Sequence, residues 1–154
     1  MKLAGLCAIG IGAIVSAGPL SVTQGYAGEG TKKCTLGTLY GQYLVAGHGT
    51  LFGVAAGIFN VQEGSVSEAA GYSLYYGDGT GTDYVTFTIN GVNQNVTSPT
   101  SFTYTLNSDC TGTRTVSSGP SFNIFAAFDG DGLSSIATTP GFAESDYERR
   151  TGSR

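Results

Sequence analysis

Only 12% of the 154 residues are charged, so few side chains could carry acid–base chemistry. Glu68 lies at even spacing from Tyr72 and Tyr76, and an inward-facing Glu68 would therefore lie among aromatic rings, where burial raises the pKa of a carboxyl. Arg114 shares a strand face with Val116 and is the cation in the middle of the chain that could pair with this carboxyl. The pattern predicts Glu68 and Arg114 as candidate catalytic residues, with a surface salt bridge as the alternative.

Aromatic residues are the second group that could bind a molecule. The chain has nine tyrosines, eight phenylalanines and no tryptophan. Such rings either line a pocket for a flat apolar ligand or fill the interior of a small protein. The candidates for ligand binding are Tyr72, Tyr76, Phe102, Tyr104 and Phe122. We therefore expect a small apolar molecule as the partner, with a filled interior as the alternative.

Two glycine-rich acidic segments, 78–83 and 129–132, place oxygen atoms at alternating positions, as a calcium loop does. Neither continues into the glutamate and helices of an EF-hand, and both are more typical of tight turns. His48 is the single histidine, which argues against zinc. The sequence also has no phosphate-binding loop or serine nucleophile motif, so we predict no metal and no cofactor.

The N-terminal segment has the pattern of an export leader. Lys2 supplies a positive charge, an uncharged apolar run covers 3–17, and small residues lead to Ala27. Residues 1–27 are therefore predicted to be a signal peptide, and residues 28–154 a single secreted or periplasmic domain. A membrane anchor is the alternative, but the apolar run is shorter than the roughly 20 residues of a spanning helix, so no stable membrane insertion is expected after cleavage.

Cys34 and Cys110 are the two cysteines outside this leader. Two cysteines in an oxidising compartment normally pair, and we expect a disulfide that closes most of the mature chain into one loop. A reactive cysteine nucleophile is the alternative, for which His48 would be the base.

The charge pattern bears on the partners. The formal net charge is −4, and no cluster of Lys or Arg forms a stripe that could follow a phosphate backbone. Nucleic acid is therefore not expected. The basic segment 148–154 is more typical of an exposed terminus. The oligomeric state stays open.

Strands must position these residues, because runs rich in Thr, Val, Tyr and Phe alternate with polar residues at a period of two. The clearest is 101–107, where Phe102 and Tyr104 share a face. The other expected strands are 39–46, 51–61, 66–76, 85–90, 122–128, 133–138 and 142–149. Pairs such as His48-Gly49 and Asn90-Gly91 are expected at hairpin turns. Eight or nine such strands predict an all-β, eight-stranded antiparallel up-and-down β-barrel, with a sandwich as the alternative.

Several short segments, taken in order, resemble exported bacterial domains of the allene oxide cyclase barrel-like family, whose architecture is also that of plant dirigent proteins. The most specific is the Asp-Cys-Thr-Gly-Thr step at 109–113. The others are 37–43, 104–108, 129–132, 138–141 and 149–150.

This resemblance implies an eight-stranded barrel with room for a small apolar molecule. Plant cyclases use a cavity acid, and dirigent relatives hold the intermediates of a coupling reaction, but no glutamate here matches the cyclase acid by motif. The sequence therefore predicts an exported barrel that binds a small apolar or aromatic molecule. The alternatives are an isomerase or cyclase that uses a cavity carboxylate, and a structural domain of the cell envelope or matrix.

Overall fold

The computed structural model describes residues 32–94, 99–117 and 119–152, so the predicted leader lies outside the described residues. Within them the chain forms nine strands and two short helices, neither of which is long and apolar enough to cross a membrane. The elements are η1 (Leu36–Thr38), β1 (Tyr40–Leu51), α1 (Gly53–Ile58), β2 (Ser65–Tyr76), β3 (Thr80–Ile89), β4 (Val92–Asn93), β5 (Thr100–Leu106), β6 (Thr111–Val116), β7 (Ser121–Ala126), β8 (Gly132–Ala137) and β9 (Phe142–Arg150).

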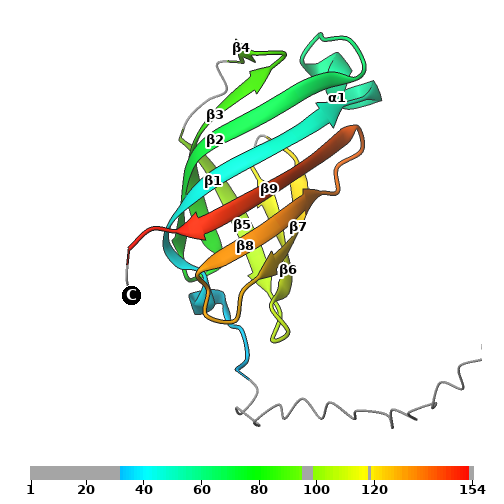
Figure 1. Cartoon of the computed structure of the whole chain (residues 1–154). Helices are drawn as coiled ribbons and strands as arrows, with labels where there is room; N and C mark the ends of the chain where they lie inside the picture. Colours follow the sequence, from blue (N-terminus) through cyan, green and yellow to red (C-terminus); the bar gives the residue numbers. More distant parts are fainter. Residues whose placement is uncertain (1–31, 95–98, 118, 153–154) are drawn as a thin grey trace, which may run out of the picture. The chain divides into compact units, whose positions relative to one another are not determined.

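Eight of the strands form a closed antiparallel ring in the order β1-β2-β3-β5-β6-β7-β8-β9, and β9 pairs with β1 (Figure 1). The pairing of β2 with β3 closes the sheet, and β4 adds a two-residue extension to β3. Closure gives each of these eight strands a paired neighbour on both sides, which is the usual solution for a small antiparallel domain. The predicted all-β class and eight-stranded antiparallel barrel are confirmed.

The two walls of the barrel differ in height. Strands β1 and β2 have 12 residues each and β3 has 10, whereas β6, β7 and β8 have six each. The short wall therefore ends part of the way up the tall wall, at the turn between β6 and β7. Above that turn, the inner face of the tall wall has no strand of the short wall opposite it.

The strand expected at 51–61 is wrong. The chain leaves β1 at Leu51 and turns into α1, whose buried Ala55 and Ala56 pack with Leu51 and Ile89. Gly53 begins the helix at φ +48°, a conformation that favours glycine, and alanine is the strongest helix former.

Two other local predictions also fail. The pair His48-Gly49 lies inside β1, which runs without a break to Leu51. Strand β6 was not among the expected strands, although Arg114 and Val116 share its inner side, as their spacing predicts. At His48-Gly49 the pairing of β1 with β2 and β9 overrides the local turn signal.

Aromatic side chains fill the end of the barrel that lies near η1. The ring of Tyr75 is at the centre of this cluster and meets Tyr43, Phe102 and Tyr104 edge-on, with ring centroids 5.0, 4.9 and 5.2 Å apart. Leu39, the residue after η1, is fully buried against the same cluster. Edge-to-face packing of this kind stabilises a core beyond its buried area. This half of the interior is therefore filled.

The predicted disulfide is confirmed. It joins Cys34, just before η1, to Cys110 in the turn between β5 and β6, with a sequence separation of 76 residues. The amide of Cys34 also donates to the carbonyl of Ser108 at 3.1 Å. Both sulfur atoms are bonded to each other, so neither cysteine serves as a nucleophile in this form.

We expect the double substitution of Cys34→Ser and Cys110→Ser to lower the free energy of unfolding by about 2 to 5 kcal/mol, because the open chain gains conformational freedom in the unfolded state. Urea unfolding of the variant and of the oxidised protein measures the difference. The wild-type protein unfolded in the presence of a reductant is the matched control. Equal unfolding midpoints for all three samples would contradict a stabilising bridge.

Candidate functional site

Strand β9 places three acids inside the barrel. Glu144, Asp146 and Glu148 occupy every second position and are 6%, 8% and 0% exposed. Successive side chains of a strand point to opposite faces, so three acids at this spacing share one face. A carboxyl group inside a protein needs a partner or a proton, because an isolated buried charge is costly.

Arg114 from β6 supplies the partner for one of these acids. Its guanidinium, 4% exposed, donates to Glu148 at 3.0 Å and also to Asp83 of β3. Tyr75 donates its hydroxyl to the same Glu148 oxygen at 3.1 Å, and Ser73 donates to Asp83 at 2.7 Å. The result is a buried network of ion pairs and hydrogen bonds that crosses the barrel from β6 to β3 and β9.

Two phenylalanine rings hold the guanidinium from its sides. The central carbon of the Arg114 guanidinium lies 4.3 Å from the ring centroid of Phe102 and 5.9 Å from that of Phe122. A cation above an aromatic face is attracted by the ring, and the attraction grows when water is excluded. The rings therefore help to fix Arg114 between the filled half and the rest of the interior.

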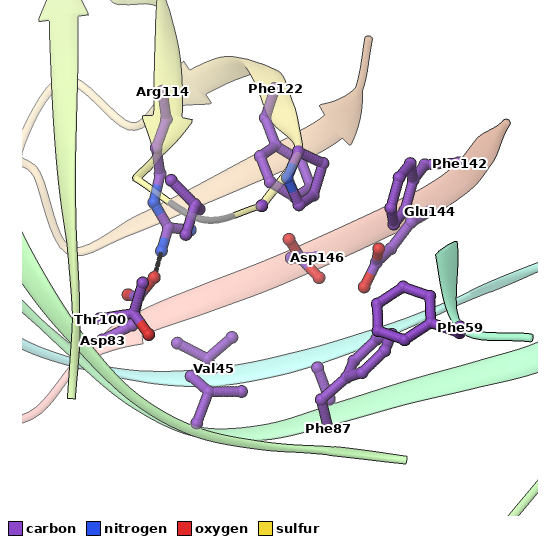
Figure 2. Close-up of a pocket in the computed structure, with 15 residues that line it drawn as sticks. Val45, Phe59, Asp83, Phe87, Thr100, Arg114, Phe122, Phe142, Glu144 and Asp146 are labelled. Atoms are coloured by element: carbon purple, nitrogen blue, oxygen red, sulfur yellow. Dashed lines mark hydrogen bonds and ion pairs between the residues drawn. The ribbon is translucent and has the colours of Figure 1, made fainter. Parts of the chain in front are cut away.

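A pocket of about 150 Å³ lies beyond this network, between Arg114 and α1. Its apolar wall includes four phenylalanines, namely Phe59, Phe87, Phe122 and Phe142. Its charged side chains are those of Asp83, Arg114, Glu144 and Asp146, and Figure 2 shows the last two directed toward the space between the rings. The turn between β6 and β7, with Gly119 and Pro120, forms part of its edge. The pocket is thus located where the short wall of the barrel ends.

Glycines on β1 make room for the two pocket acids. The register pairs Gly47 with Asp146 and Gly49 with Glu144. A Cβ atom at Gly47 would lie 1.9 Å from Oδ1 of Asp146, and one at Gly49 would lie 2.7 Å from the Cα of Glu144. Any larger residue at these positions would displace the acids. The segment Gly47-His48-Gly49 is therefore required by the site and not by a turn.

Burial changes the proton affinity of the acids. Burial raises the pKa of Glu144 to about 7, and the nearby charge of Asp146 adds to this, while Arg114 opposes it. Burial also raises the pKa of Glu148 to about 7 against the opposing effect of Arg114. The pKa of Asp146 is raised by burial as well, although Arg114 and a hydrogen bond from Ser135 oppose the rise. Glu144 and Glu148 therefore exchange protons near neutral pH.

The predicted inward orientation of Glu68 is wrong. Glu68 is exposed on the outer face of β2, between His48 of β1 and Thr88 of β3. The residues at the odd-numbered positions of β2, including Ser73 and Tyr75, form its inner face. Glu68 and Arg114 therefore lie on opposite sides of the barrel wall and are not brought together.

Tyr72 and Tyr76 share this outer face. The ring of Tyr72 stacks on Tyr84 with centroids 4.8 Å apart, and the Tyr76 hydroxyl bonds to Thr82 at 2.9 Å. Neither tyrosine lines the pocket, so their expected place in the barrel interior is wrong.

The other three predicted ligand residues are inside the barrel. Phe122 lines the pocket, whereas Phe102 is behind it, against Arg114. Tyr104 belongs to the filled half and donates its hydroxyl to the carbonyls of Leu36 and Leu39 at 2.8 and 3.1 Å. Of the five predicted residues, only Phe122 contacts the pocket.

Sequence reasoning missed the four interior acids. The signal for three of them was present in 142–150, where Phe142, Glu144, Asp146, Glu148 and Arg150 share one parity.

In the part of the chain that the structure describes, no group of three or more His, Cys, Asp or Glu side chains could hold a metal ion. Comparisons with protein-family models, curated proteins and solved structures find no match for this chain. The site must therefore be interpreted from its own geometry.

We expect the protein to lose stability as the pH rises from about 4.5 to about 7 through the raised pKa of Glu144. The folded state binds this proton more tightly than the unfolded state does. The stabilisation is therefore fully present below the pKa that Glu144 has in the unfolded state, and it is lost above the pKa that Glu144 has in the folded state. Glu144→Gln removes up to about 3 kcal/mol of that pH dependence. Urea unfolding at pH 5 and pH 8 measures it, with the exposed Glu68→Gln as the control. Identical pH dependence in both variants would contradict the assignment.

We expect Arg114→Met to destabilise the protein by about 3 to 5 kcal/mol, because Asp83 and Glu148 would stay buried without their cation. Thermal and urea unfolding measure the loss. The triple variant Arg114→Met, Asp83→Asn and Glu148→Gln should recover much of it, since the charges are removed together. A triple variant as unstable as the single one would refute this account.

Proposed function

We propose that this protein binds a small, largely apolar molecule in the pocket between Arg114 and α1. The observation that carries the proposal is a pocket of about 150 Å³ with phenylalanines on one side and a few polar groups on the other. Small-molecule sites commonly combine a mostly apolar lining with a few placed polar groups. An apolar cavity of roughly 150 Å³ accommodates benzene, so the expected ligand is about the size of one ring.

The fold gives this pocket a fixed shape. Its walls are strands held by ladder hydrogen bonds, and its floor is the Arg114 network. A preformed site avoids much of the entropy cost of ordering side chains on binding. The proposed ligand therefore enters a site that already exists in the free protein.

Export and family membership belong to the same proposal. The Cys34–Cys110 disulfide supports an oxidising compartment outside the cytosol. The closed eight-stranded barrel supports the predicted likeness to allene oxide cyclase and dirigent barrels. That likeness stays a prediction, and the proposed ligand rests on the pocket alone.

A second candidate function is an isomerase. Glu144 faces the pocket with a pKa raised to about 7, which is the range in which a carboxyl works well as both acid and base. An isomerisation in which Glu144 takes a proton from one atom of the ligand and returns it to another needs no co-reactant. Binding comes first in either case, and it is the step to test.

We expect toluene to bind the wild-type protein and to shift NMR signals of pocket residues. Val45→Phe places a ring in the pocket, because Val45 lines it, and should abolish these shifts. Leu44→Phe makes the same kind of change at the neighbouring residue, which is exposed on the outer face, and should leave binding intact. Shifts that persist in Val45→Phe, or no shifts in the wild type, would rule out this site.

A further inference from the structure

The charges inside the barrel do not balance. Four buried acids, Asp83, Glu144, Asp146 and Glu148, lie around the pocket and the network below it, and Arg114 is the cation among them. Arg114 pairs with Asp83 and Glu148. Two acids of the pocket are therefore left without a cation of their own among the described residues.

The second interior arginine is committed elsewhere. Arg150 donates to the carbonyls of Thr38 and Gly130 and to the hydroxyl of Tyr43, which lie at the filled end of the barrel. Its guanidinium does not line the pocket.

Glu144 is the less satisfied of the two pocket acids. Asp146 accepts a hydrogen bond from Ser135 at 3.1 Å. Within residues 32–94, 99–117 and 119–152, Glu144 has no hydrogen bond or ion pair, although it is 6% exposed. Figure 2 shows its carboxyl facing the pocket beside the rings of Phe59 and Phe142. Because this carboxyl is accessible from the pocket and bonds to no described side chain, a donor group of a ligand can bind to it without displacing a protein partner.

We propose that the pocket takes a small alkylamine that carries one aromatic ring, in its ammonium form, with the ammonium against Glu144 and Asp146 and the ring against the phenylalanines. The inference rests on the proposed function and names its ligand class. The two acids are two residues apart on one strand face, roughly 7 Å between Cα atoms, so one ammonium group reaches both.

The walls of the pocket favour this class over others. An anion would meet Glu144 and Asp146, which carry the same charge when ionised. A neutral hydrocarbon would leave Glu144 without a partner. The four phenylalanine rings attract an organic cation through their faces and remove its hydrocarbon part from water. A charge-assisted hydrogen bond to a carboxylate adds to both.

Protonation links ligand binding to pH. The charged groups that face Glu144 are Asp146 on its own strand, Arg114 on β6 and Asp83 on β3. β1, β2 and the end of α1 contribute residues that do not titrate, namely Val45, Ala69 and Phe59. Since burial raises the pKa of Glu144 to about 7, an ammonium ligand must displace its proton below that pH. Affinity for the amine should therefore rise as the pH increases through 7. It should fall again only where the amine itself loses its proton, at about pH 10.

The test compares four compounds that share one ring, namely benzylamine, benzyl alcohol, toluene and benzoate, by NMR titration or calorimetry at pH 8. We expect benzylamine to bind about tenfold or more tighter than benzyl alcohol, and benzoate to bind weakest. Glu144→Gln should remove the preference for benzylamine, and the exposed Glu68→Gln should keep it.

The outcomes separate the two proposals. Toluene and benzyl alcohol binding as tightly as benzylamine, or a preference for benzoate, would overturn the amine inference and leave the proposed function intact. No binding by any of the four compounds would overturn both. One measurement needs no variant. The affinity of the wild-type protein for benzylamine should rise about tenfold between pH 6 and 8, whereas its affinity for benzyl alcohol should not change. A flat profile for benzylamine would also overturn the inference.

Discussion

The burial of one guanidinium among four carboxyl groups is the constraint on which the interior of this barrel depends. Each charge is costly away from water. Arg114 pairs with two carboxylates, the hydroxyls of Ser73 and Tyr75 each donate to one of them, and two rings lie beside the cation. Nε of Arg114 and Oε2 of Glu148 have no hydrogen-bond partner among the described residues, so the network is only partly satisfied. The same network divides the interior. On one side aromatic rings fill the space, and on the other side the pocket remains.

The fold could be predicted from the sequence to a large extent. Alternation in 101–107 gave the correct inner face of β5, and the count of cysteines outside the expected leader gave the Cys34–Cys110 pair. The strand at 51–61 failed because a short apolar run fits a buried helix as well as a strand. The sequence shows that 51–61 is apolar, but its conformation depends on the packing of Ala55 and Ala56 against Ile89.

The site was predicted less well, because strand parity identifies two faces without telling which one is inside. On β2 the outer face carries Tyr72 and Tyr76, and the inner face carries Ser67 and Ser73 as well as Tyr75, so aromatic residues occur on both faces. Small inner residues there leave space for the Arg114 network. The two ion pairs of this network join Arg114 to residues 31 and 34 positions away in the sequence. The need for glycine at position 47 is explained only by Asp146 on another strand. Such relations are not visible in local sequence.

The unequal height of the two walls separates the tyrosine cluster from the pocket that we propose as a binding site. The disulfide, η1 and the tyrosine cluster all belong to the closed end, while Phe59, Phe87 and Phe142 belong to the open end near α1. The three phenylalanines also pack against Leu51, Ala55, Ala56 and Ile89, so they form part of a second core. A library of variants at these positions would explore new ligands, and its cost in stability would fall on this second core while the tyrosine cluster stays unchanged.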